Sequence, residues 1–488
     1  MKKFLSLLLS LLMCTTLISG CNKPASSGSG VSDDTLFSEE EISYVMIYNP
    51  EIYDENIMVN ARLNTGDFAE SVEAMISRAD GAKEIPEFIP MSISDISEGL
   101  ELDKFDLGGS RGGAFITPYS VGDTHDFYCG ADSRVLKTFV CRYAGEDCNI
   151  WTCDNSVSDS DIISFGNEFD NKIYDSVTEE FGESRFYANG GKVNILLYPM
   201  SGSLGGFFHP YDLYASDEVS EAEKTTYALH TDHDVININS VNLVLPEYVY
   251  GTAAHEFQHL ICFTAFFDTV NYTDMRTWLN EAMSGYIEEK LYPGTKKLAG
   301  HYEEFNASNR IRHGQSLYNF DNETTRSNFD IGVYGSVYLF SEYLSSIGGE
   351  KVFSNIHSYW RNSYSTTLDE AEAIINSIPE SAYNKINNQF DFSEISFEDS
   401  DYEFMSKLTL SFYLSLLDVD SSDPDAYKNV KSQTLLYDEI NPADIEGGGR
   451  VIVALKDGEF KFPEDADEGL IYIGLNKDFE VVTDIVIH

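Results

Sequence analysis

The sequence predicts an α+β fold, with a sheet and helices in the centre and a mostly β module at each end. Three observations support this prediction. Short apolar runs that alternate with polar residues occupy both ends of the chain. In the centre, apolar residues recur every three or four positions, as on the buried face of a helix. Two continuous apolar runs, residues 193–198 and 235–239, predict buried strands in the same region.

The beginning of the chain predicts an export signal, residues 1–20. Two lysines precede an apolar stretch, residues 4–18, which is too short to span a bilayer. A small pair of residues before Cys21 is typical of a bacterial lipoprotein, in which the cysteine becomes the acylated first residue; the alternative is an ordinary secretory signal. We expect lipidated Cys21 to anchor an exported protein to the bacterial membrane, with residues 21–41 as a flexible tether to the folded body.

The chain is strongly acidic, with a net charge of −49, which becomes −51 when the two lysines of the signal peptide are lost. Such a surface repels phosphate groups, which argues against nucleic acid as a partner. We favour a solubilising acidic coat over calcium binding or a preference for basic substrates. Residues 418–425 lack the glycine and the final glutamate of an EF-hand loop, so Ca²⁺ is only a secondary candidate. The sequence does not indicate the oligomeric state.

The cysteines predict a compact cluster in the first third of the chain. Of the 7 cysteines, Cys14 belongs to the signal and Cys21 to the anchor. Disulfides are permitted outside the cell, and four clustered cysteines allow three pairings, among which the sequence does not choose. A zinc knot and simple buried thiols are the alternatives. The four clustered residues are Cys129, Cys141, Cys148 and Cys153.

The periodicity divides the folded body into three parts. Residues 42–154 predict a mostly β domain, with strands at 44–48, 114–119, 136–143 and 149–153 and one helix at 68–78. Residues 155–425 predict the central domain. Its first helix carries Ile162, Phe165, Phe169, Ile173, Val177 and Phe181 on one face and ends at Gly182; further helices are expected at 248–266, 275–290, 334–346 and 406–417. Residues 426–488 predict a C-terminal β module, with strands in 451–455, 469–475 and 481–488.

The strongest motif lies on the helix predicted at 248–266, where the sequence reads GTAAHEFQHLICF. His255 and His259 are four residues apart and therefore lie on one face of a helix, from which both can reach one zinc ion. Glu256 lies beside that face and can take a proton from a water at the metal and deliver it to a leaving amine. With 10 histidines and 81 acidic residues, chance produces roughly 0.03 such matches in a chain of this length. Two exposed histidines on an unrelated helix are the alternative.

The third ligand decides the kind of site. One arrangement takes a histidine at position 265, where this chain has Ala265. Another takes a glutamate from the following helix, and Glu281 lies in the run WLNEA, far enough along for that helix to return beside the first. Asp274 is the best alternative, either as a ligand or as a hydrogen-bond partner of a zinc histidine. The other rivals are Asp268 and Glu288.

Three further residues or segments are candidates near this site. Cys262 lies on the same stripe as the histidines, but three ligands on one helix cannot surround an ion tetrahedrally, so we interpret it as a packing residue. Tyr334 begins a helix and is our candidate donor to the oxyanion, with Tyr286, His301 and His313 as competitors. Residues 205–209, in a Gly- and aromatic-rich loop at 202–212, are the candidate edge strand against which a substrate chain would pair.

Residues 154–344 resemble the hyicolysin-like neutral zinc metallopeptidases, a bacterial family of the gluzincin group of zincins. The resemblance is carried by AHEFQHLICF and WLNEAMSGYIEE, and more weakly by YGSVYLFSEYL, DNSVSDSDI and FDNKIY. It implies a zincin fold, with a mixed sheet over the active-site helix and a helical lower subdomain. It also implies Zn²⁺ bound by His255, His259 and Glu281, with Glu256 as base. Ala282 stands where many gluzincins have glycine, which is a mild departure.

These observations predict an endopeptidase that acts on a peptide or protein substrate. Zinc would polarise the scissile carbonyl, and Glu256 would activate the attacking water. The chain has no GxMEN motif, which disfavours an aminopeptidase that grips a free N-terminus. Two alternatives stay open: a non-catalytic surface-binding lipoprotein (an adhesin) that keeps the fold, and a zinc hydrolase of non-peptide amides. An intact Glu256 argues against the first, because a purely structural zinc site needs no base.

Overall fold

A computed structural model of the chain divides the described residues into two compact units, each of which we treat by itself. One unit comprises residues 81–301 and 320–382, and the other comprises residues 1–80, 302–319 and 383–488. The described residues are 35–37, 42–52, 61–63, 118–130, 135–184, 191–200, 204–209, 212, 233–267, 275–295, 305–318, 332–362, 370–397, 399–417, 434–436, 443–455, 460–461, 469–483 and 485–487.

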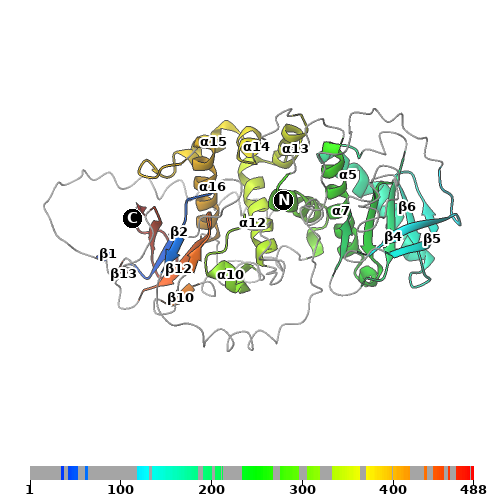
Figure 1. Ribbon diagram of the computed structural model, residues 1–488, viewed down its shortest axis with the longest axis horizontal. Helices are drawn as coiled ribbons and strands as arrows, with labels where there is room; N and C mark the ends of the chain where they lie inside the picture. The colour runs from blue at the N-terminus through cyan, green and yellow to red at the C-terminus, as the bar shows by residue number, and fades with distance from the viewer. Residues whose placement is uncertain are drawn as a thin grey trace, which may run out of the picture. The chain divides into compact units, whose positions relative to one another are not determined.

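A mixed six-stranded sheet forms one layer of the first unit (Figure 1). The strand order is β4-β5-β6-β7-β9-β8, in which β6, β7 and β9 run parallel and the other neighbours run antiparallel. β8 is therefore an edge strand of this sheet. The strands are β4 (Thr124–Cys129), β5 (Val135–Ala144), β6 (Cys148–Thr152), β7 (Val193–Tyr198), β8 (Gly206–Phe208) and β9 (Val235–Asn239).

Both faces of β7 are covered, which explains its continuous apolar run. Every residue of the strand is buried, although successive side chains point to opposite faces of the sheet. Leu196 and Tyr198 pack with Phe127, Phe139 and other residues in one apolar cluster. Asn194 lies on the same face of β7 as Leu196 and Tyr198. It accepts a hydrogen bond from the indole N–H of Trp151 at 2.9 Å, so its buried amide is satisfied.

A long helical segment follows the first three strands, as the three-to-four-residue period predicts. It consists of α4 (Asp159–Glu168), a π-helical turn (Phe169–Ile173) and α5 (Tyr174–Phe181). Ser158 caps its beginning by accepting a hydrogen bond from the N–H of Asp161. Gly182 ends it at φ 87°, a conformation that glycine adopts without strain.

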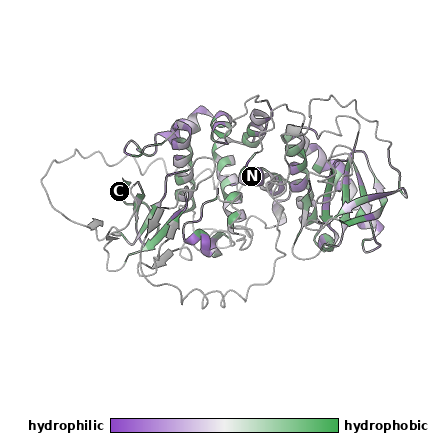
Figure 2. Ribbon diagram, in the orientation of Figure 1, coloured by the Kyte–Doolittle hydropathy of each residue, from purple (hydrophilic) through white to green (hydrophobic). Residues whose placement is uncertain are grey.

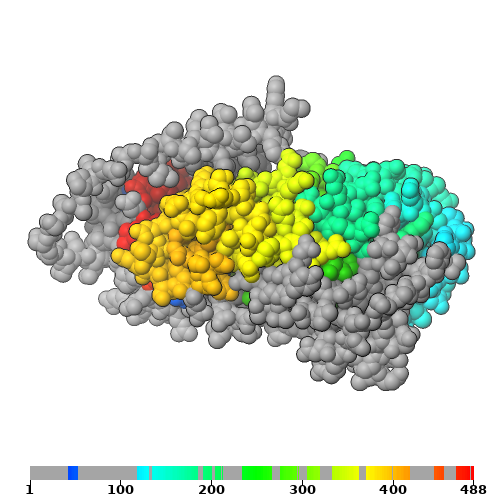
Figure 3. Space-filling view, turned by 90° about the horizontal axis from the view of Figure 1, so that it is seen from above, coloured from blue at the N-terminus to red at the C-terminus, as the bar shows by residue number. Residues whose placement is uncertain are grey.

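The remaining helices of this unit include the two that carry the predicted site. They are α7 (Pro246–Phe267), α8 (Thr277–Leu291), α12 (Gly332–Gly348), α13 (Val352–Asn362) and α14 (Glu370–Ser377). Green, hydrophobic residues follow the sheet and the helices packed against it in Figure 2. In contrast, α13 and α14 expose one polar side each, which forms part of the yellow surface in Figure 3.

The second unit is built on a five-stranded sheet with the order β10-β12-β2-β14-β15. Its strands are β2 (Tyr44–Tyr48), β10 (Thr434–Leu436), β12 (Arg450–Ala454), β14 (Ile471–Leu475) and β15 (Val486–Ile487). The unit also contains α10 (Asn309–Arg312), the last turns of α15 (Glu380–Asn387), and α16 (Ser400–Leu417). Two small strand pairs complete it: β1 (Thr35–Phe37) with β13 (Phe460–Lys461), and β3 (Ala61–Leu63) with β11 (Ala443–Ile445).

Buried tyrosines tie this sheet to α16. The hydroxyl of Tyr48, in β2, donates to the backbone carbonyl of Ser406 at 3.0 Å. The hydroxyl of Tyr413, in α16, donates to the carbonyl of Gly448 at 3.1 Å. An apolar cluster that includes Val45, Ile47 and Tyr472 packs on the other face of the sheet, because side chains alternate along β2. The rings of Tyr48 and Tyr413 are apolar and their hydroxyls are satisfied, so these two residues stabilise a fully buried packing.

The α+β class is confirmed, and most predicted strands and helices that fall on described residues lie within a few residues of their expected positions. The exceptions are β4, which was not predicted, and α16, which begins at Ser400 rather than at residue 406. The division into compact units differs from the expected boundaries at residues 154 and 425. β6 pairs with β7 across residue 154, and β2 pairs with β12 and β14 from the other end of the chain. The alternation of a strand shows which face is buried but not which distant strand is its neighbour.

Several predicted segments lie outside the described residues. They are the signal peptide at 1–20, the lipidation site Cys21, the helix at 68–78 and most of the strand at 114–119. Among the described residues, no helix is long and apolar enough to cross a membrane.

Candidate metal centre

α7 presents its two histidines to the interior because the helix is buried on nearly every side. Residues 251–264 are all buried, with Ala254 and Phe257 at 0% exposed. Phe257 lies 5.3 Å from the ring of Phe169 in the π-helical turn. The buried helix thereby fixes His255 and His259, one turn apart, with ring centroids separated by 4.7 Å.

α8 supplies the third side chain of the cluster. Its residues 277–288 are all buried, so the helix lies within the core of the unit. Glu281, 1% exposed, points toward both histidines. Its Oε2 lies 3.3 Å from Nε2 of His255, and its Oε1 lies 3.5 Å from Nε2 of His259. The two helices therefore bring together the residues that the sequence separates by more than twenty positions.

The three side chains fit a metal ion. One potential ligand atom from each of His255, His259 and Glu281 lies within 4.8 Å of the others. Among the described residues, Nε2 of His259 and Oε2 of Glu281 have no hydrogen-bond partner, although both atoms are buried. Two imidazoles and one carboxylate form a three-ligand set typical of catalytic zinc. Calcium takes six to eight oxygen ligands, which this cluster does not offer.

The electrostatics of the cluster favour a positive charge between the ligands. Burial lowers the pKa of His255, but its contacts with Glu281 and Glu288 outweigh burial and raise that pKa to about 10. Burial raises the pKa of Glu281, and the two nearby histidines outweigh it and lower that pKa to about 2. The carboxylates that stabilise a proton on His255 would also stabilise a divalent cation bound among these groups.

Glu256 lies beside the three residues and is 1% exposed. Burial raises the pKa of its carboxyl, and the neighbouring histidines oppose this rise. Its carboxylate accepts a hydrogen bond from the backbone N–H of Phe208, in the edge strand β8. The edge of the sheet therefore lies next to the acid that the sequence predicts to act as a base.

Glu288 contacts the histidine rather than competing with Glu281 as a ligand. Its Oε2 lies 3.5 Å from Nδ1 of His255, on the side of the ring away from Glu281, and accepts a hydrogen bond from the hydroxyl of Tyr338 at 2.7 Å. From the sequence, Glu288 was predicted only as a rival ligand, and no role was predicted for Tyr338. Glu288 lies two turns after Glu281 on the same face of α8, and this spacing is the signal that could have predicted its contact with His255.

The other predicted residues have various locations. Tyr334 is 1% exposed in α12, and its role as a donor to the oxyanion stays a prediction. Tyr286 donates from its hydroxyl to the carbonyl of Glu350, and Nδ1 of His313 contacts the carbonyl of Asn309. Cys262 is buried in α7 and is not part of the cluster, in keeping with a packing residue. Asp268, Asp274, His301 and the acidic segment 418–425 lie outside the described residues.

The four clustered cysteines are free thiols in the structure. Cys129 and Cys141 belong to one apolar cluster, and Cys153 packs against it. In the sheet, Cys129 pairs with Val135 and Cys141 pairs with Trp151, so neither stands opposite another cysteine. Burial raises the pKa of the Cys141 thiol to about 11, which makes it unreactive near neutral pH.

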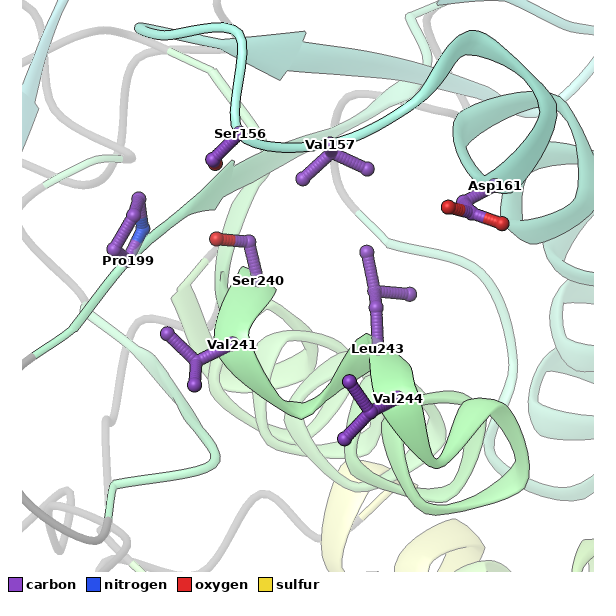
Figure 4. Close-up of a pocket in the computed structure, with 8 residues that line it drawn as sticks. All are labelled: Ser156, Val157, Asp161, Pro199, Ser240, Val241, Leu243 and Val244. Atoms are coloured by element: carbon purple, nitrogen blue, oxygen red, sulfur yellow. The ribbon is translucent and has the colours of Figure 1, made fainter.

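A hollow of about 340 Å³ lies between the beginning of α4 and the short helix Ser240–Val244 that precedes α7 (Figure 4). Its lining combines apolar residues such as Val157, Leu243 and Val244 with the polar Ser156, Ser240 and Asp161. Among the described residues that line it, only Asp161 is ionisable, so they do not form a set of metal ligands.

The fold and the cluster on α7 and α8 are compatible with a metallopeptidase, and comparison with known proteins supports that class. The chain is 36% identical over 230 residues to the neutral metalloprotease ShpI of Staphylococcus hyicus. The matched region makes up 44% of this chain and 49% of that protein, so the chain spans about half the length of this relative. No family model matches the chain.

Proposed function

We propose that this chain is a zinc-dependent endopeptidase with a zincin-type catalytic region. The observation that carries the proposal is the buried cluster of His255, His259 and Glu281, with one ligand atom of each within 4.8 Å of the others and Glu256 beside them. The 36% identity to a neutral metalloprotease gives independent support. A cluster that only stabilised the fold would have no need of a fourth, buried acid.

His255, His259 and Glu281 are the residues that would hold the zinc ion. Zinc, when bound, supplies a Lewis acid that polarises the carbonyl of the scissile bond and lowers the pKa of a water molecule. Both Nε2 atoms lie within 3.5 Å of the Glu281 carboxylate, so the three donors converge from two helices rather than from one. This convergence supports a catalytic set of three protein ligands.

Glu256 is the proposed general base. Its Oε1 is buried and has no hydrogen-bond partner among the described residues, and the N–H of Phe208 holds the carboxylate in place. This oxygen takes a proton from the attacking water and delivers it to the nitrogen of the leaving amine. Burial raises the pKa of Glu256, which makes the carboxylate a stronger base than an exposed glutamate.

The substrate chain is proposed to lie along β8. β8 is the edge of its sheet, and Asn239 donates its N–H to the carbonyl of Gly205 on the inner side. By the antiparallel alternation, the carbonyls of Gly206 and Phe208 face outward, where an extended peptide can pair with them. Tyr334 remains our candidate donor to the oxyanion, and its replacement by phenylalanine should lower kcat more than it changes KM.

We also propose that the protein is exported and anchored through lipidated Cys21. The support is the signal-like sequence at residues 1–20, which precedes this cysteine directly. In a bacterial host, the wild-type chain should appear in the membrane fraction with an acylated N-terminus. The Cys21→Ala variant should not be acylated; equal acylation of both chains would contradict the assignment.

Metal analysis combined with a digest of casein or a peptide library tests the catalytic proposal. The wild type should hold one zinc ion per chain and cleave internal peptide bonds. Glu256→Gln should hold the same zinc and cleave roughly 10²–10⁴ times more slowly, because it lacks the base. Glu247→Gln, which changes an exposed acid on the same helix, is the matched control and should behave like the wild type. A wild type that holds zinc but cleaves no peptide would show the endopeptidase proposal to be wrong.

A further inference from the structure

The two ring nitrogens of His255 face two different carboxylates. Nε2 lies 3.3 Å from Oε2 of Glu281, and Nδ1 lies 3.5 Å from Oε2 of Glu288. A neutral imidazole has one N–H donor and one acceptor nitrogen. If Nδ1 carries the hydrogen toward Glu288, Nε2 has no hydrogen and its lone pair is directed toward Glu281. A metal ion in the cluster would bind this Nε2.

Glu288 is fixed by a third helix. It is 0% exposed, and the hydroxyl of Tyr338, in α12, donates to the same Oε2 that faces His255. Tyr338 is itself buried, at 2% exposed. Tyr338 of α12 therefore contacts Glu288 of α8, and Glu288 in turn contacts His255 of α7. Among the described residues, His259 contacts a carboxylate only through its other ring nitrogen, Nε2, which lies 3.5 Å from Oε1 of Glu281.

Two glycines make room for this row of side chains. A Cβ atom on Gly251, in α7, would lie 2.7 Å from Oε1 of Glu288. A Cβ atom on Gly285, in α8, would lie 2.6–2.8 Å from ring carbons of Tyr338. Glycine weakens a helix interior relative to alanine, so neither position is explained by helix propensity. The space that each glycine leaves explains both positions.

We propose that Glu288, held by Tyr338, is a positioning residue that orients His255 for the metal. The proposal rests on the zinc site proposed above. Partners of this kind fix the tautomer and the ring orientation of a ligating histidine, and their loss typically reduces metal affinity by roughly 10–100-fold. Glu288 therefore accounts for the difference between the two histidines of α7: among the described residues, only His255 has a carboxylate facing its Nδ1.

The test measures zinc affinity of the full chain by competition with a chelator, for Glu288→Gln and Tyr338→Phe. We expect roughly 10–100-fold weaker zinc binding for Glu288→Gln and a smaller loss for Tyr338→Phe. The double variant should lose less than the sum of the two, because both act through one contact. Cobalt in place of zinc should show a changed visible absorption spectrum in Glu288→Gln, which reports the ligand geometry directly.

A second tyrosine–glutamate pair provides a matched control. The hydroxyl of Tyr292 donates to Oε1 of Glu168 at 2.8 Å, in the same unit. Glu168→Gln and Tyr292→Phe remove the same chemical groups and should leave zinc affinity and the cobalt spectrum unchanged. Gly251→Ala adds a test that keeps every polar group: the new methyl group displaces Glu288 and should also weaken zinc binding.

The outcomes separate this proposal from the proposed function. A wild type that does not bind zinc overturns the zinc site itself. If the wild type binds zinc and Glu288→Gln and Tyr338→Phe bind it equally well with an unchanged cobalt spectrum, the positioning role is wrong. If the control pair weakens zinc as much as Glu288→Gln does, the effect comes from general loss of stability, and the positioning role is again wrong.

Discussion

Two pairs of neighbouring histidines occur in the same unit of this protein, and their surroundings differ. His255 and His259, on α7, have ring centroids 4.7 Å apart and face the carboxylates of Glu281 and Glu288. His125, in β4, and His233, just before β9, have ring centroids 5.2 Å apart. The second pair lies among aromatic rings, with the ring of Phe127 4.5 Å from that of His125.

The difference shows that carboxylates, and not the proximity of two imidazoles, make the first pair a candidate metal site. Contacts with Glu281 and Glu288 raise the pKa of His255 to about 10, whereas burial and then His233 lower the pKa of His125. Asp126, adjacent to His125 in the strand, points to the opposite face and accepts a hydrogen bond from Thr138. Among the described residues, neither His125 nor His233 belongs to a group of three metal-ligating side chains.

The largest effect is expected when the carboxylate of Glu281, which faces both histidines of the first pair, is removed. Glu281→Gln should reduce zinc affinity by more than the roughly 10–100-fold that accompanies loss of an outer partner, because it removes one of three ligands. Metal analysis after dialysis checks this. Asp274→Ala should weaken zinc at most slightly; the reverse result would reassign the third ligand to Asp274.

An intermediate effect concerns the pH dependence of stability in the zinc-stripped chain. The pKa of His255 rises from its usual 6.5 to about 10 on folding, so its stabilising contribution is fully present below pH 6.5 and is lost as the pH rises through 10. At ~1.4 kcal/mol per pKa unit, the loss amounts to a few kcal/mol at most. Urea unfolding at pH 7 and pH 10, with a chelator present, should show a larger fall for the wild type than for His255→Gln. Equal falls would contradict the coupling.

The smallest effect, of opposite sign, is expected at the second pair. The pKa of His125 is lowered on folding, so its neutral form is favoured; this contribution is present above pH 6.5 and is lost as the pH falls below that value. His125→Gln should therefore flatten the decline of stability between pH 7 and pH 5 slightly, because the ring is partly exposed to solvent. Zinc content should not change in this variant, and a loss of zinc would remove the distinction between the two pairs.

The sequence predicted the core of the candidate site because its information is local. The spacing of His255 and His259 needs only a helix, and Glu281 needs only the next helix to return beside the first. The partner of His255 could not be assigned in this way. Glu288 lies on a predicted helix, but its contact with Nδ1 depends on how closely α7 and α8 approach at Gly251, and Tyr338 comes from a third helix.

The fold was predictable element by element but not in its sheet neighbours. β7 and β9 follow directly from their apolar runs, and the long helix ending at Gly182 follows from its period. The pairing of β6 with β7 joins segments on either side of an expected domain boundary, and no local pattern marks it. The short edge strand β8 was recognised as a candidate from its glycines and aromatic residues rather than from alternation.

The central position of β2 has a consequence for the biosynthesis of the protein. Tyr48 pairs with Arg450 on one side and with Ile471 on the other, so both neighbours of this strand are synthesised more than 400 residues after it. Such distant pairings form slowly, because a very long loop must close first. β2 therefore has no partner strand until residues 450–475 have been synthesised, and a chain that is cut short before Arg450 leaves this apolar strand without either neighbour and accessible to chaperones and proteases.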